Sequence, residues 1–181
     1  MIDLWLEFHA QTHHNAAGLA SGHYDVALTD MGRAHATTVL RARYAGQSFD
    51  AAYASDTQRA YDTTCLMFAG RDIPIFRDAR LRECDYGALE GRARADMEAM
   101  RLDAIDAPFP LGESYMQVAA RMRSFLTQLA IERDGQTIML VGHAATMYCL
   151  DHLLRSRSMR DAILMQSERP YRYRLEANLL R

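Results

Sequence analysis

The stretch TIMLVGH, residues 137–143, decides the fold class of this chain. It contains a continuous apolar run, which is the pattern of a strand covered on both faces of a parallel sheet. His143 follows this strand directly, and residues 144–154 are predicted to form a helix. A histidine therefore stands at the point where a buried strand passes into a helix.

The beginning of the chain repeats this arrangement. The largely apolar run IDLWLEF, residues 2–8, is predicted to form a strand that ends at His9. Further strands are predicted at residues 51–54, 73–76 and 171–175. Helices are predicted over residues 29–44, 56–68 and 94–102, and from the capping box of Ser114 and Gln117 onward. Strands alternating with helices predict an α/β fold: one three-layer domain, residues 1–181, with a mostly parallel central sheet flanked by helices.

Two segments lack a regular pattern. Residues 10–28 contain several turn residues and are predicted to form a long loop. Residues 78–112 are predicted to form an irregular segment that binds substrate or covers it as a lid. The large apolar side chains in and just after this segment favour core or lid packing; they are Met97, Met100, Phe109 and Met116.

Ligands of parallel sheets bind beyond the carboxyl ends of the strands. His9 and His143 both lie there, so we expect them to face one pocket. Arg59 closely follows the strand at residues 51–54, and Glu83 lies in the irregular segment. A neutral imidazole attacks phosphorus, a carboxyl group protonates a leaving oxygen, and arginine binds phosphate with a planar fork. These are the groups that phosphoryl transfer without a metal requires, although each of them also has an ordinary structural use.

Six blocks of sequence carry a family resemblance, in the order in which that family has them. They are LEFHAQT at 6–12 with Asn15; SG at 21–22 with DVALT at 25–29 and Gly32; YASD at 53–56 with Arg59, Ala60 and Thr63; LRE at 81–83 with Tyr86, Gly87, Glu90 and Gly91; GES at 112–114; and LVGH at 140–143. Together they resemble the motifs of the histidine phosphatase superfamily, in its phosphoglycerate mutase-like branch.

The resemblance implies a role for each matching residue. His9 matches the histidine that is transiently phosphorylated, and Arg59 and His143 match the groups that hold the phosphoryl oxygens. Glu83 matches the acid that protonates the leaving group and then activates water. Weaker substrate contacts are implied for Asn15, Ser21 and Gly22. The resemblance implies a small phosphorylated substrate and no cofactor.

Two positions depart from the family pattern, which has arginine before the nucleophile and glycine after it. Here these residues are Phe8 and Ala10. Two interpretations follow: an enzyme in which another cation replaces the arginine, or a catalytically weak or inactive relative that binds a phosphorylated ligand. We hypothesise that the replacement comes from one of four residues in the neighbouring loops: His13, His14, Arg80 or Arg82.

The residue after Glu83 separates hydrolysis from phosphoryl transfer between substrates. Mutases of this family have arginine there and a longer chain, whereas this chain has Cys84 and 181 residues. The sequence therefore favours a phosphomonoesterase. The i, i+4 spacing of His9 and His13 suits a metal site only on a helix, and because a strand and a loop are predicted there, no metal site is expected.

Composition limits the partners. The net charge of −2 gives no general attraction to nucleic acid or an anionic membrane. All 21 basic residues are arginine, which excludes Schiff-base and P-loop lysine chemistry. The three cysteines include no CxxC pair, there is no signal peptide pattern and no apolar run of about 20 residues, so a cytoplasmic protein is expected. The oligomeric state and the identity of the substrate do not follow from the sequence.

Overall fold

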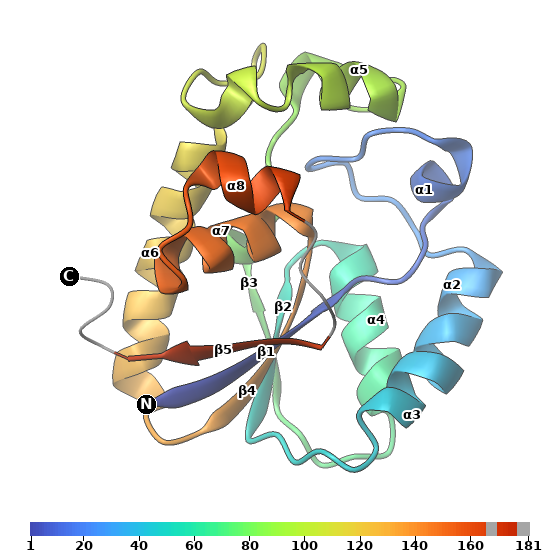
Figure 1. Cartoon of the computed structure of the whole chain (residues 1–181). Coiled ribbons are helices and arrows are strands. Elements are labelled where there is room, and N and C mark those ends of the chain that lie inside the picture. Colours follow the sequence, from blue (N-terminus) through green and yellow to red (C-terminus); the bar gives the residue numbers. More distant parts are fainter. Residues whose placement is uncertain (166–169, 177–181) are drawn as a thin grey trace.

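A central sheet organises the computed structural model of the chain, which describes residues 1–165 and 170–176 (Figure 1). Its strand order is β3-β2-β4-β1-β5. The strands are β1 (Ile2–Phe8), β2 (Ala51–Ser55), β3 (Ile75–Asp78), β4 (Thr137–Gly142) and β5 (Tyr171–Leu175). The first four run parallel, and β5 pairs antiparallel with β1 at the edge. The predicted α/β class with a mostly parallel sheet is confirmed.

The burial pattern of each strand matches its place in the sheet. In central β4, Ile138 and Leu140 face one hydrophobic core, and Met139 and Val141 face the other. Edge strand β5 instead alternates buried and exposed residues, because only one of its faces is covered. This difference explains why the two segments have such different sequence patterns.

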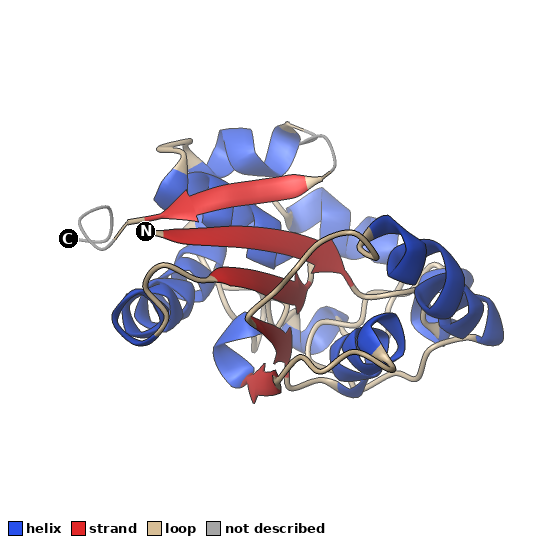
Figure 2. Cartoon of the chain, turned by 90° about the horizontal axis from the view of Figure 1, so that it is seen from below, coloured by secondary structure: helices blue, strands red, loops and turns tan. Residues whose placement is uncertain are grey.

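Helices cover both faces of the sheet (Figure 2). On one face lie α6 (Tyr115–Glu132), α7 (Ala144–Leu154) and α8 (Met159–Leu164). On the other lie α2 (Asp30–His35), α3 (Arg41–Arg43) and α4 (Gln58–Phe68), with a π-helical turn, Ala36–Leu40, between α2 and α3. The predicted capping box at the start of α6 is present, since Ser114 and Gln117 bond reciprocally. The three predicted layers are therefore present.

The helix expected over residues 29–44 begins as predicted, with the Thr29 side chain accepting a bond from the Gly32 N–H at 3.0 Å. Its interior is distorted into the π turn. Thr37 and Thr38 donate their hydroxyls to backbone carbonyls of the preceding turn, and such bonds compete with the regular helical ladder. Two neighbouring threonines thus coincide with the break.

One prediction for residues 10–28 is wrong, because this loop contains a short helix, α1 (His13–Ala17). Thr12 and Asn15 cap it reciprocally, and Gly18 ends it in the left-handed conformation at φ 68°. Asparagine stands where a capping box usually has glutamate or glutamine, so the motif is easily missed in the sequence. Helix α8 was also not predicted.

The segment at residues 79–112 crosses the end of the sheet where the parallel strands finish. It contains α5 (Arg94–Met100) and three 3-10 turns: η2 (Ala79–Leu81), η3 (Gly87–Leu89) and η4 (Asp103–Ile105). A row of aromatic rings anchors it to α6: Phe109 lies 5.2 Å from Tyr86 and 6.0 Å from Tyr115, between ring centroids. No helix in the described parts of the chain is long and apolar enough to cross a bilayer.

Candidate active site

The two predicted histidines meet because β1 and β4 are neighbours. Phe8 pairs with Gly142 in register, and the His9 backbone N–H donates to the Gly142 carbonyl at 3.1 Å. Each strand ends one residue before its histidine, so the rings leave the sheet side by side. Their centroids are 5.1 Å apart, with an interplanar angle of 61°.

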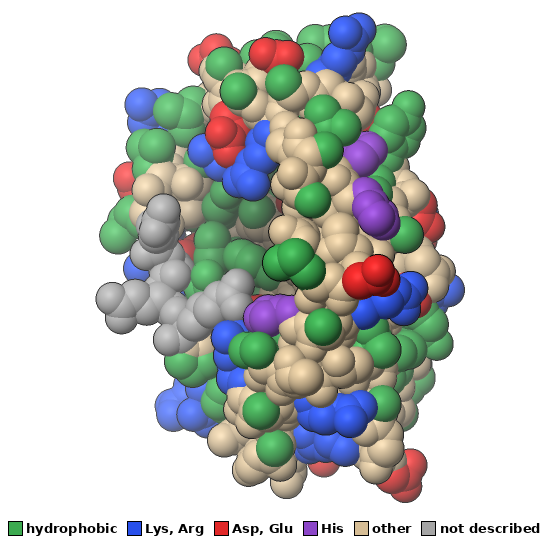
Figure 3. Space-filling view, turned by 90° about the vertical axis from the view of Figure 1, so that its right-hand side faces the viewer, with side chains coloured by type: hydrophobic (Ala, Val, Ile, Leu, Met, Phe, Trp, Pro, Cys, Tyr) green, Lys and Arg blue, Asp and Glu red, His purple; other side chains and the backbone are tan. Residues whose placement is uncertain are grey.

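A pocket of about 270 Å³ opens at these strand ends. All seven residues predicted from the sequence line it: His9, Asn15, Ser21, Gly22, Arg59, Glu83 and His143. A hollow lined by hydrophobic side chains, with a histidine beside it and basic side chains near its rim, is visible in Figure 3. The volume lies near the lower end of the range for ligand pockets, roughly 300–1,000 Å³, and suits a small molecule.

His9 has the tautomer that a nucleophile needs. Its Nδ1 lies 2.8 Å from the Ala10 carbonyl oxygen, which only accepts hydrogen bonds, so Nδ1 carries the proton. Nε2 therefore keeps its lone pair. Burial and, next, the charge of Arg59 lower the pKa of His9 from 6.5 to about 4, which leaves the ring neutral at physiological pH.

His143 and Arg59 bring unsatisfied polar atoms to the pocket. Both ring nitrogens of His143 and the Nε of Arg59 are buried without a hydrogen-bond partner among the described residues. Burial, followed by the charge of Arg59, holds the pKa of His143 well below its usual value. Buried polar groups are nearly always paired in folded proteins, so three such atoms at one pocket indicate a place for a ligand.

The backbone around Gly22 holds Arg59 in position. Arg59 is 1% exposed and donates Nη2 to the Gly22 carbonyl at 2.7 Å and Nη1 to the Tyr24 carbonyl at 2.5 Å. Gly22 has φ +50°, a left-handed conformation that favours glycine, and a Cβ there would displace the carboxyl group of Glu90. Arg59 lies in the first turn of α4, whose positive end adds to the attraction for an anion.

Glu83 is a buried carboxyl group whose surroundings shift its pKa upward. Its Oε1 accepts bonds from the backbone N–H of Cys84 at 2.8 Å and of Ala145 at 3.3 Å. Burial nevertheless outweighs these bonds and the charge of Arg59, and raises the pKa of Glu83. A carboxyl group in this state serves as a proton donor.

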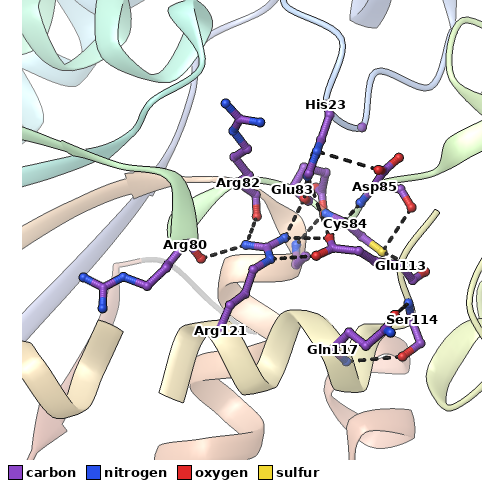
Figure 4. A network of polar contacts seen from close by, with 12 residues as sticks. His23, Arg80, Arg82, Glu83, Cys84, Asp85, Glu113, Ser114, Gln117 and Arg121 are labelled. Carbon is purple, nitrogen blue, oxygen red and sulfur yellow. Dashed lines mark hydrogen bonds and ion pairs between the residues drawn. The ribbon is translucent and has the colours of Figure 1, made fainter. Parts of the chain in front are cut away.

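Arg121 fixes the backbone on which Glu83 stands (Figure 4). From α6 it donates to the carbonyl oxygens of Arg80, Arg82 and Glu83, all at 2.7–2.8 Å, and it forms an ion pair with Glu113 at 3.0 Å. Sequence reasoning missed this residue. Its position follows from α6 packing beside the irregular segment, which no local motif indicates.

The two departures from the family pattern have different structural consequences. Phe8 lines the pocket and stacks on Tyr171 of β5, with ring centroids 5.2 Å apart. Ala10 is buried in the core, and its N–H donates to Thr63 Oγ1 at 2.9 Å. Ala10 is not among the described residues with positive φ, so its backbone does not require glycine.

The hypothesis that His13, His14, Arg80 or Arg82 replaces the missing arginine is not supported, because none of the four lines the pocket. Arg80 is paired with Asp78, and Arg82 with Asp56. The additional cations in the pocket lining are instead Arg94 and Arg101 of the irregular segment.

These two arginines could have been found from their spacing. Arg94, Met97 and Arg101 follow at i, i+3 and i+7, the spacing of one helix face, and all three line the pocket. Of the apolar residues predicted to pack in the core or a lid, Phe109 is buried and Met116 is 38% exposed. In the described part of the chain, no three His, Cys, Asp or Glu side chains gather as a metal site requires.

Comparison with known proteins identifies the family. Residues 4–166 match the profile of the histidine phosphatase superfamily (branch 1). The chain therefore belongs to this superfamily, as its sequence blocks predict.

Relatives in this family include phosphatases and mutases. Adenosylcobalamin/alpha-ribazole phosphatase of Salmonella typhimurium is 31% identical over 155 residues, 81% of this chain and 76% of that protein. The 2,3-bisphosphoglycerate-dependent phosphoglycerate mutase of Methylocella silvestris is 30% identical over 156 residues, 78% and 76% of the two chains. The solved structure of a mycobacterial glucosyl-3-phosphoglycerate phosphatase with VO₃ is similar at a TM-score of 0.79 and 26% identity, covering 91% of this chain and 87% of that one.

Proposed function

We propose that this protein is a phosphomonoesterase that hydrolyses a small phosphorylated molecule through a phosphohistidine at His9, without a metal ion. One observation carries the proposal. A neutral His9 with a free Nε2 shares a pocket with unsatisfied donors on Arg59 and His143. A phosphoryl group would supply the missing partners of these atoms while lying within reach of the nucleophile.

In the first step, Nε2 of His9 attacks phosphorus. An N–P bond forms and the bond from phosphorus to the ester oxygen breaks. Arg59 and His143 bind the phosphoryl oxygens, and His143 does so by donating the N–H of its neutral ring. Glu83, whose pKa is raised by burial, acts as the acid that gives its proton to the leaving oxygen.

In the second step, the ionised Glu83 takes a proton from water. The water oxygen bonds to phosphorus and the N–P bond breaks, which releases phosphate and restores neutral His9 and protonated Glu83. Asn15, Ser21 and Gly22 line the same pocket and are proposed as additional substrate contacts. The segment at residues 78–112 is proposed to cover the substrate.

The alternative is a relative that binds a phosphorylated ligand without hydrolysing it. The reason to consider it is Phe8, which stands where the family pattern has arginine. The buried acid at Glu83 favours the enzyme, because a binding site for phosphate gains nothing from a carboxyl group whose pKa is raised. Cys84 after Glu83 favours hydrolysis over mutase transfer. The three free cysteines agree with a cytoplasmic location, which stays a proposal.

The proposal is tested by release of phosphate from phenyl phosphate in the presence of a chelator. The wild type should be active, and His9→Ala should lose about 10⁴-fold or more, as expected when a nucleophile is removed. The matched control is His35→Ala, since His35 is exposed and lies outside the pocket lining. Phosphate release by His9→Ala at the wild-type rate, or a wild type that binds phosphate but is inert, would contradict the proposal.

A further inference from the structure

Arg101 lines the pocket, and unlike several other arginines of this region it has a hydroxyl as its partner. Arg80, Arg82, Arg94 and Arg121 each pair with a carboxylate. Arg101 is half-buried, and its bond is from Nη1 to the hydroxyl of Tyr148 at 3.2 Å. Among the described residues, no carboxylate forms an ion pair with it. Its charge therefore faces the pocket without an anion to neutralise it.

A second polar group lies in the same part of the pocket. The Tyr115 hydroxyl is buried and has no hydrogen-bond partner within the described parts of the chain, and its ring packs edge-on against Tyr148, with centroids 5.9 Å apart. Tyr115, Tyr148 and Arg101 come from three different helical segments and all line the pocket. Two hydroxyls and a guanidinium are the donors that recognise a carboxylate or a phosphate.

This cluster is separate from the place proposed for the phosphoryl group. Tyr148 lies five residues beyond His143 on α7, which is roughly 7–8 Å along a helix axis. Met97 and Phe8 contribute apolar walls to the same pocket. The pocket therefore has guanidinium groups at Arg59, Arg94 and Arg101 and apolar surface as well. Among the described residues, Glu83 is the one carboxyl group in its lining.

Building on the proposed function, we propose that Arg101, Tyr148 and Tyr115 form a second anion subsite that binds a carboxylate or phosphate on the leaving group of the substrate. The substrate class is then a small phosphomonoester with an apolar body and an anionic end. Arg94 contributes less, because its side chain is 59% exposed and its Nε is bonded to Glu98 at 2.8 Å.

The test compares substrates of one shape and different charge. The 3- and 4-carboxyphenyl phosphates carry the second anion, and the corresponding carbamoylphenyl phosphates carry a neutral amide. We expect the wild type to prefer a carboxylate ester in kcat/KM. Arg101→Met should reduce that preference by about 10- to 100-fold, the range for one charged hydrogen bond. Tyr148→Phe should reduce it less.

Arg92→Met is the matched control, because Arg92 lies two residues from α5, is exposed and does not line the pocket. It should keep the wild-type preference. Phenylene bisphosphates in the same assay show whether the subsite prefers a second phosphate to a carboxylate.

The inference is overturned if Arg101→Met lowers kcat/KM equally for the carboxylate and amide esters, since Arg101 then acts on the phosphoryl group or on the fold. The inference is also overturned if Arg101→Met keeps the wild-type preference for the carboxylate ester over the amide ester with both the 3- and the 4-isomer. In either case the wild type still hydrolyses the esters, so the proposed function survives. A wild type inert toward every ester contradicts the proposed function, and the subsite with it.

Discussion

Two arginines influence the pKa of Glu83. They differ in whether the protein provides hydrogen-bond partners for all of their guanidinium nitrogens. Arg121 donates every guanidinium nitrogen to a carbonyl or to Glu113. Arg59 is more deeply buried, yet no described residue accepts a hydrogen bond from its Nε. Folded proteins rarely leave such a group unpaired unless it has a function. Arg121 therefore stabilises the structure, whereas Arg59 has a donor left to bind a ligand.

Of the two arginine variants, Arg59→Met is expected to have the larger effect on activity. Losing a donor to the transition state lowers kcat/KM by about 10²–10³. The same change removes a buried charge, so the free energy of unfolding should fall less than in Arg121→Met. Phosphate release and urea unfolding measure the two effects. Activity within tenfold of the wild type would mean that Arg59 does not contact the phosphoryl group.

Arg121→Met should show the opposite balance. It removes one donor each from Glu113 and three carbonyl groups, of which Glu113 keeps the N–H of Asp85. Breaking such a partly exposed network lowers the free energy of unfolding by about 2–3 kcal/mol. We expect kcat to fall more than KM rises, because Glu83 loses its support. A urea midpoint equal to that of Arg92→Met would contradict the structural role.

Restoring the family arginine tests how much the apolar residue beside His9 weakens the binding of phosphate. In Phe8→Arg, a guanidinium enters the pocket wall next to the nucleophile. Inhibition by inorganic phosphate should become about 10- to 100-fold stronger, as one charged hydrogen bond allows. Phe8→Leu controls for loss of the stack on Tyr171. If phosphate binds both variants equally, position 8 does not face the phosphoryl site.

The dependence of kcat/KM on pH sharpens the roles of His9 and Glu83. His9 must be neutral, so activity should fall as pH decreases through about 4. Glu83 must be protonated, and because its pKa is raised above 4.5, activity should fall again at a higher pH. Glu83→Gln should lower activity and abolish this second decline. The substrate phosphate loses its second proton with a pKa of about 6, and the profile is corrected for this ionisation. A second decline that persists in Glu83→Gln would assign it to another group.

The sequence was informative where local chemistry decides structure. The apolar runs before His9 and His143 predicted two buried parallel strands, and the order of the sheet made the two rings neighbours. Helix α1 was missed because its cap uses Asn15 in place of an acidic or glutamine side chain.

Other features depend on tertiary contacts and leave no local signal. The stack of Phe8 on Tyr171 requires the edge strand to return beside β1. The entry of Arg101 into the pocket depends on how the segment at 79–112 crosses the strand ends. The expected replacements at Arg80 and Arg82 failed for the same reason, since nearby aspartates bind both side chains.

The central claim is that His9 receives the phosphoryl group. The most direct measurement is to quench Glu83→Gln during turnover of 2,4-dinitrophenyl phosphate, whose leaving group needs no proton from Glu83, under alkaline conditions, which preserve a phosphohistidine, and to map the modified peptide by mass spectrometry. Slow hydrolysis in this variant should let a phosphoenzyme accumulate, with one phosphoryl group on His9. Turnover without a phosphoenzyme, or a phosphoryl group on His143 instead, would contradict the claim.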